Sequence, residues 1–199
     1  MVGSHGYSLN PFSLDRMANA VEKVRCRLIK AAEALAAAKV PYAIVGDSAV
    51  TIWVARVDEA AVRNTQDVDI LLARPDFPAA TAALEKVGFV YRHIAGMDAF
   101  LDSPTAKPRD AVHIIFSGEK VRPHEEVANP EVSESQAAGA LRVLDLLPLV
   151  RIKLTAFRDK DRTHLRDLLD VGLIDASWLP RLPAPLAQRL QQLLDTPGS

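Results

Sequence analysis

Two aspartates with one residue between them, Asp67 and Asp69, stand at the start of an apolar run. Because side chains alternate across a β-strand, this spacing puts both carboxylates on one face. The apolar residues 70–72 that follow indicate a buried strand, where carboxylates are costly without a compensating cation. Mg²⁺ binds through one or two carboxylates together with substrate phosphates. We therefore interpret the pair as ligands for Mg²⁺ or Mn²⁺, against the simpler interpretation of two solvated acids at a strand edge.

A second feature with chemical meaning lies upstream, where an apolar run at 42–45 passes through Gly46 into a helix that begins near Ser48. A glycine at this turn lets a phosphate approach the helix N-terminus, where backbone N–H groups and the helix dipole favour an anion. The Ser48 hydroxyl would add a contact. The simpler interpretation is a glycine kept for steric reasons. Asp47 works against phosphate binding, because a carboxylate repels a triphosphate.

The elements that must position these residues follow from the hydrophobic pattern and the turn residues. The pattern predicts helices at 14–38, 48–56, 75–87, 148–158, 161–171 and 185–194. It predicts strands at 42–45, 68–73, 89–94, 99–102 and 112–116, and a polar, irregular segment at 119–139. Strands and helices do not alternate regularly, so we expect an α+β fold with a mixed sheet rather than a doubly wound one.

We expect three parts along the chain: a disordered or tag-like segment at 1–12, a core at 13–145 and a helical tail packed on it at 146–199. With 199 residues, 49% of them hydrophobic, the chain can bury a sizeable core. The net charge of −1 indicates no global basic field for a nucleic acid, although a local patch stays open. One cysteine excludes an intramolecular disulfide, and without a Cys/His cluster we expect no structural zinc.

No apolar run reaches the roughly 18 residues that span a bilayer, and no signal peptide is visible. We therefore expect a cytoplasmic protein with no membrane partner.

The order of the motifs resembles a known family. Gly46-x-x-Ala49, a helix, and then Arg63-x-Thr65-x-Asp67-x-Asp69 followed by aliphatic residues resembles the nucleotidyltransferase fold of the DNA polymerase beta superfamily. The bacterial branch that includes the AbiEii-type toxins is the closest match. The resemblance implies that Asp67 and Asp69 bind Mg²⁺ together with a nucleoside triphosphate, and that Gly46, with Ser48, cradles the phosphates. Arg63 and Thr65 match the arginine and threonine that precede the aspartates, which implies that both belong to the nucleotide-binding residues; Arg63 would support the phosphates or the loop.

The third carboxylate of that family normally lies on a later strand, in a pattern that residues 111–118 match except that His113 replaces the aspartate. A neutral imidazole ligates a metal and acts as a general base near neutral pH. It does not supply the negative charge that a second Mg²⁺ would require. A catalytic histidine and a packed strand histidine in a degenerate site both stay open.

The charge-rich segment after residue 149 resembles the tail of AbiEii-type proteins, which implies that Lys153 meets the triphosphate. For His164 and Asp167, which follow at helical spacings, the expected setting is a solvated helix face, with Asp161 left open.

Taken together, the resemblance implies transfer of a nucleoside monophosphate from a nucleoside triphosphate to a hydroxyl acceptor, which would be a tRNA, a protein or a small molecule. It also implies an antitoxin as a protein partner. The alternative is a nucleotide-binding or protein-interaction module that keeps the fold and has lost turnover, and the evidence for it is Asp47 and His113.

Overall fold

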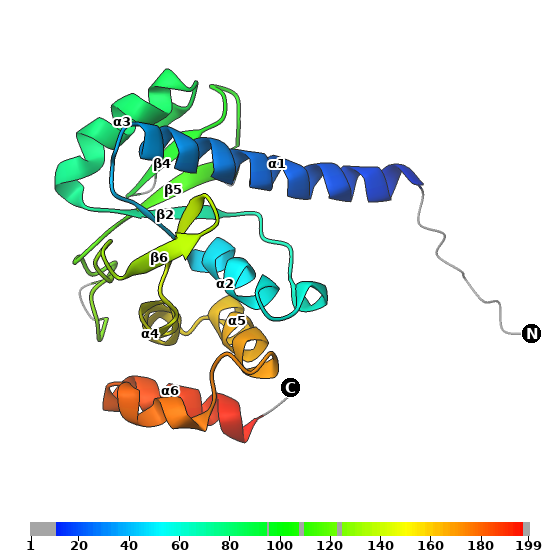
Figure 1. The fold of residues 1–199 in the computed structure, drawn as a ribbon, viewed down its shortest axis with the longest axis vertical. Helices are drawn as coiled ribbons and strands as arrows, with labels where there is room; N and C mark the ends of the chain where they lie inside the picture. The colour runs from blue at the N-terminus through cyan, green and yellow to red at the C-terminus, as the bar shows by residue number, and fades with distance from the viewer. Residues whose placement is uncertain (1–10, 95, 108–109, 123–124, 197–199) are drawn as a thin grey trace, which may run out of the picture.

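A mixed β-sheet forms the centre of the molecule. The computed structural model describes residues 11–94, 96–107, 110–122 and 125–196 (Figure 1). Within these residues, seven strands make one sheet in the order β3-β4-β5-β2-β1-β7-β6. The strands are β1 Ala43–Val45, β2 Val68–Leu72, β3 Val90–Ile94, β4 Met97–Leu101, β5 Ala111–Phe116, β6 Ser135–Ala138 and β7 Leu141–Leu144. Strand β2 is parallel to β5 but antiparallel to β1, which in turn is parallel to β7.

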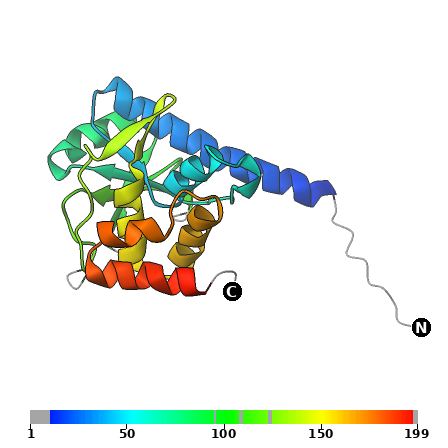
Figure 2. The same cartoon turned by 60° about the horizontal axis from the view of Figure 1, so that its bottom comes forward.

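The helices cover both faces of this sheet. They are α1 Pro11–Ala37, α2 Gly46–Ala55, α3 Phe77–Lys86, α4 Leu146–Ala156, α5 Asp159–Asp170 and α6 Ala184–Asp195. Helices α1 and α3 lie on one face; α2 lies on the other, with α4, α5 and α6 beyond it (Figures 1 and 2). The expected α+β architecture with a mixed sheet is confirmed.

Side chains of β2 show how the strand is buried between the two helical layers. Val68, Ile70 and Leu72 are fully buried, and Leu71 on the opposite face is nearly so. Burying one such side chain contributes roughly 1.5–3 kcal/mol relative to leaving it exposed. A strand buried on both faces holds the residues at its amino end, Asp67 and Asp69, in a fixed direction.

Two expectations about the elements need correction. Strands β6 and β7 form an antiparallel hairpin that adds the last two strands beside β1. The sequence predicted an irregular segment at 119–139 and no strand after it. Strand β6 has only four residues, small or polar, so its pattern is weak; Gly139, with φ +63°, makes the turn. Helix α1 begins at Pro11 rather than at residue 14. The rest of the expected tag-like segment, residues 1–10, lies outside the described residues.

The pairing of the strands brings distant residues together where the central strands β1, β2 and β5 end. We call this row of strand ends the edge of the sheet. In the register, Asp69 of β2 lies opposite Val45 of β1 on one side and His113 of β5 on the other. Helix α2 follows β1 directly, so its first residue, Gly46, lies at the same edge. This edge holds the amino ends of β2 and β5 and the carboxyl end of β1.

Among the helices of the described residues, none is both long and apolar enough to cross a membrane.

Candidate functional site

Gly46 and Asp69 fit against each other at the sheet edge. Gly46 has φ +63°, a left-handed conformation that favours glycine. A Cβ at Gly46 would lie 2.9 Å from Cγ of Asp69 and would overlap its Oδ2 atom. The turn between β1 and α2 therefore leaves room for a carboxylate where any other residue would place a side chain.

His113 lies beside the same carboxylate. Its Nδ1 atom is 3.5 Å from Oδ1 of Asp69, and both side chains are mostly buried. The register of β2 and β5 pairs these two residues across neighbouring strands. We call Gly46, Asp69 and His113 the sheet-edge group.

Asp67 is held through its backbone and its side chain. The Ser48 hydroxyl donates to the carbonyl oxygen of Asp67 at 3.1 Å. The Thr65 hydroxyl lies 3.3 Å from both that oxygen and the Asp67 amide nitrogen, from which it accepts. The Asp67 carboxylate receives the Lys160 ammonium at 2.8 Å. Ser48 and Thr65, which the sequence resemblance assigned to nucleotide binding, here fix the loop that carries Asp67.

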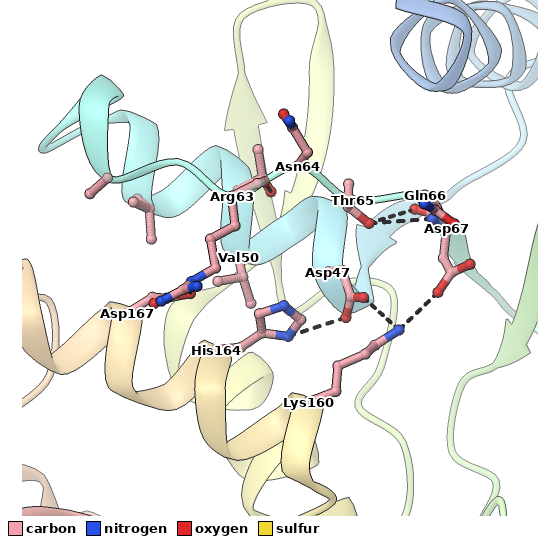
Figure 3. A pocket seen from close by; sticks show the side chains of 13 residues that line it. Asp47, Val50, Arg63, Asn64, Thr65, Gln66, Asp67, Lys160, His164 and Asp167 are labelled. Atoms are coloured by element: carbon pink, nitrogen blue, oxygen red, sulfur yellow. Dashed lines mark hydrogen bonds and ion pairs between the residues drawn. The ribbon is translucent and has the colours of Figure 1, made fainter. Parts of the chain in front are cut away.

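Buried charges lie between α2, α4 and α5. The Lys153 ammonium donates to Asp47 at 2.8 Å, to Asp161 at 3.2 Å and to Nδ1 of His164 at 3.1 Å. Lys160 contacts the second oxygen of Asp47 at 2.6 Å, so this ammonium joins Asp47 to Asp67 (Figure 3). We call Asp47, Lys153, Lys160, Asp161 and His164 the lysine cluster.

The two lysines of the cluster differ in accessibility. Lys153 is only 4% exposed and has a partner for each of its three N–H donors, whereas the Lys160 side chain is 47% exposed. A phosphate contact by Lys153, as the resemblance implies, would require breaking one of these bonds. Lys160 reaches an incoming anion more easily.

The cluster also shifts the protonation of its members. Burial raises the pKa of Asp47, but Lys153 and Lys160 outweigh it, so the pKa lies below its ordinary value. The same balance, with Arg158 and Lys153 as the cations, lowers the pKa of Asp161. Burial lowers the pKa of Lys160, but hydrogen bonds to Asp47 and Asp67 raise it above its ordinary value. These acids and the lysine are therefore charged at neutral pH.

His164 is neutral at neutral pH. Burial, followed by the neighbouring Lys153 ammonium, lowers its pKa below the ordinary value. Because an ammonium group only donates, Nδ1 of the neutral ring accepts from Lys153 and the ring proton lies on Nε2. His164 is thus a hydrogen-bond donor on the wall of a neighbouring pocket.

That pocket has a volume of about 300 Å³ and lies between α2, the segment 61–67 and α5 (Figure 3). Val50, Val54 and Ala61 supply apolar surface, and polar residues of 63–67 and α5 supply the remainder. Asp67 and three members of the lysine cluster, Asp47, Lys160 and His164, belong to its wall, whereas the sheet-edge group does not. Lys160 therefore lies where the pocket meets the carboxylates.

Arg63 closes the far end of this pocket. Its Nε atom donates to both carboxylate oxygens of Asp167, at 2.8 and 2.9 Å. Arg63 supports the loop through α5 in this structure, which is one of the two roles that the resemblance implies for it.

The expected solvated setting of His164 and Asp167 is wrong, and Asp161, which was left open, is buried as well. Asp161 and Asp167 are buried and His164 is mostly buried, because Lys153 and Arg63 compensate the two acids and the helix packs on α2. Sequence reasoning also assigned no role to Lys160. Its signal was the helical spacing of Lys160, His164 and Asp167, which places the three on one face.

A divalent cation shared with a triphosphate fits the donors at this edge. Asp69 of β2 and Asp67, which immediately precedes this strand, offer hard oxygen ligands, and the absent side chain of Gly46 keeps space beside Asp69. Across the part of the chain that the structure describes, no group of three or more His, Cys, Asp or Glu side chains is positioned to hold a metal.

The chain matches no family model and no curated protein. Among solved structures, it is similar to JHP933 from Helicobacter pylori, with 19% identity and a TM-score of 0.45 over 94% of this chain and 76% of that one. It is also similar to the antibiotic-resistance factor ANT(2'')-Ia in solution, with 13% identity and a TM-score of 0.45 over 91% and 85%. A crystal structure of ANT(2'')-Ia with adenylyl-2''-tobramycin gives 15% identity and a TM-score of 0.45 over 89% and 90%. Likeness at this level assigns no ligand or activity to this chain.

Proposed function

We propose that this chain is a metal-dependent nucleotidyltransferase, which transfers a nucleoside monophosphate from a nucleoside triphosphate to a hydroxyl acceptor. The observation that carries the proposal is the meeting of three features at one edge: two carboxylates, a helix N-terminus opened by Gly46, and the ammonium of the half-exposed Lys160 side chain. Carboxylates alone suit many cations, but a cation site beside an anion site suits a metal–triphosphate complex.

Each residue has a role in this proposal. Asp67 and Asp69 hold Mg²⁺, which when bound neutralises phosphate charge and orients the phosphates. The first turn of α2, opened by Gly46, receives phosphate oxygens, and Lys160 donates to them. Ser48 and Thr65 keep the Asp67 loop in place, and Arg63 holds that loop through Asp167.

The reaction itself is a substitution at the α-phosphorus. The acceptor oxygen forms a bond to this atom, the bond to the bridging oxygen breaks, and pyrophosphate leaves. The acceptor proton passes to the imidazole of His113, whose position beside Asp69 supports a base role. Positioning and charge neutralisation carry most of the rate enhancement.

The alternative, a binding module without turnover, has one observation in its favour. Asp47 lies in the first turn of α2 and engages both lysines, so it competes with a phosphate for the same cations. The ion pairs cancel much of the repulsion that Asp47 would otherwise exert on a triphosphate. We therefore place the alternative second.

The test is transfer of label from each of four α-labelled nucleoside triphosphates, with Mg²⁺ or Mn²⁺. tRNA, cell protein and an aminoglycoside are offered as separate acceptors. We expect Asp69→Asn to reduce transfer by about two orders of magnitude, which corresponds to about 2.7 kcal/mol of transition-state stabilisation. Asp76→Asn is the matched control, because that aspartate is only partly buried, precedes α3 and makes no side-chain capping bond.

The outcomes separate the two functions. Transfer that depends on Asp69 supports the enzyme, and the acceptor that takes up label identifies the substrate class. Triphosphate binding without transfer or pyrophosphate release favours the module. Absence of triphosphate binding contradicts both. An antitoxin partner and membership of the AbiEii-type branch stay predictions of the sequence resemblance.

A further inference from the structure

The ammonium of Lys160 lies beside Asp67, where the proposed metal ion would also bind. Its Nζ atom is 2.8 Å from Oδ2 of Asp67 and 2.6 Å from Oδ2 of Asp47, so it joins a proposed metal ligand to the first turn of α2. In Figure 3 the ammonium points between the two carboxylates, at the boundary of the pocket. The site thus contains a positive charge of its own.

We propose that Lys160 is a resident counter-cation, whose ammonium stays beside the Asp67 carboxylate until a divalent cation displaces it. The inference rests on the proposed function, because that function makes Asp67 a metal ligand. A cation at Asp67 and the Lys160 ammonium would compete for the same carboxylate oxygen and repel each other at this separation.

The other lysine of the cluster does not suit this role. Lys153 is buried and satisfies Asp47 and Asp161 from within the fold. Lys160 lies in the first turn of α5 with nearly half of its side chain exposed, so its ammonium moves away from Asp67 without uncovering a buried charge. Asp47 keeps Lys153 as its partner when Lys160 leaves.

The consequence is a preference for the order in which ligands bind. A free divalent cation binds the Asp67 carboxylate only if Lys160 loses its ion pair with that carboxylate. A cation that arrives with a triphosphate brings anionic oxygens to which Lys160 transfers its hydrogen bonds. Lys160 therefore weakens binding of the bare metal and favours the metal–triphosphate complex.

The test is binding of Mn²⁺ alone, measured from the electron paramagnetic resonance signal of the free ion. We expect Lys160→Met to bind Mn²⁺ about tenfold more tightly than the wild type, since one competing charge is removed. Lys160→Arg keeps the charge and should bind as weakly as the wild type. Lys86→Met, at the end of α3, is the control for the loss of a lysine elsewhere.

Loss of the gain in Lys160→Met/Asp67→Asn would place the extra affinity at Asp67 and support the proposal. Equal Mn²⁺ affinity in Lys160→Met and the wild type overturns it, as does an equal gain in Lys86→Met. In either case, Asp69-dependent transfer of label would leave the proposed function standing. Failure of the proposed function is a separate result: no label transfer, and no Mn²⁺ binding by any variant.

Discussion

The two aspartates of one strand end are stabilised in different ways. Asp67 has a lysine ammonium at 2.8 Å, so its charge is balanced by a side chain from α5. Asp69 lies against a glycine that leaves it room and beside an imidazole at 3.5 Å. One carboxylate depends on charge compensation and the other on shape. Two aspartates of one sequence motif should therefore respond differently when a neighbouring residue is substituted: loss of a positive charge should affect Asp67, and added side-chain volume should affect Asp69.

The same difference extends to the groups around them. The lysine cluster is an ion network among helices, where the loss of one partner leaves an opposite charge buried. The sheet-edge group is a backbone arrangement, where added volume is the disturbance. Stability measurements on both groups test whether this contrast is real.

The largest expected effect is on the lysine cluster. Lys153→Met keeps the length of the side chain but leaves Asp47 and Asp161 with less compensation inside the protein. Breaking a buried ion pair by removing one partner costs about 3–5 kcal/mol. We expect a loss of this size in the free energy of unfolding, measured by urea denaturation.

The control for this prediction is Lys153→Met/Asp47→Asn, which removes one of the uncompensated acids. It should recover part of the loss, because an asparagine carries no charge to desolvate. A Lys153→Met protein as stable as the wild type would contradict the assignment of Lys153 as the centre of the cluster.

The next effect is on the sheet-edge group. Gly46→Ala forces a residue with a Cβ into φ +63°, which costs roughly 1–2 kcal/mol, and adds an overlap with Asp69. Gly139→Ala is a matched control, because Gly139 has the same φ and nothing within 4 Å of the added Cβ. The difference between the two losses in unfolding free energy isolates the overlap.

We expect Gly46→Ala to destabilise the protein more than Gly139→Ala. Replacing Asp69 by Ala in the Gly46→Ala background should remove the excess but not the backbone part. Equal losses at both glycines would show that Asp69 moves aside without strain, and the shape argument would then be wrong.

Part of the sheet-edge group was within reach of the sequence because strand spacing and turn patterns are local. A spacing of two residues places Asp67 and Asp69 on one face, and the glycine between a strand and a helix marks the turn. The His113 position followed from a motif on a strand that pairs directly with β2. Strand periodicity is a short-range rule, whereas the pairing of β2 with β5 became visible only in the structure.

The lysine cluster was out of reach because it is assembled from distant segments. Lys153 and Asp47 are 106 residues apart, and Lys160 and Asp67 are 93 apart. Helical spacing shows which residues of α5 share a face, but not which surface that face meets. Without the packing of α5 on α2, buried partners look like solvated charges.

The smallest effect concerns the protonation of His164. Burial and the Lys153 ammonium lower its pKa in the folded chain, so between that pKa and its unfolded value near 6.5 the unfolded chain binds more protons. Stability should therefore fall as the pH drops below about 6.5, and this contribution should level off below the folded pKa. Urea denaturation from pH 8 to 5.5 measures the slope.

The control for this last effect is His164→Gln, which keeps a polar side chain but does not titrate in this range, so it should lose the slope. An unchanged slope in His164→Gln would assign the pH dependence to another group. A slope of opposite sign would mean that Asp47, 3.3 Å from the ring, controls His164 more strongly than burial and Lys153 do. In that case the ring would carry a charge in the cluster, and His164 would present a cation to the pocket instead of a neutral N–H donor.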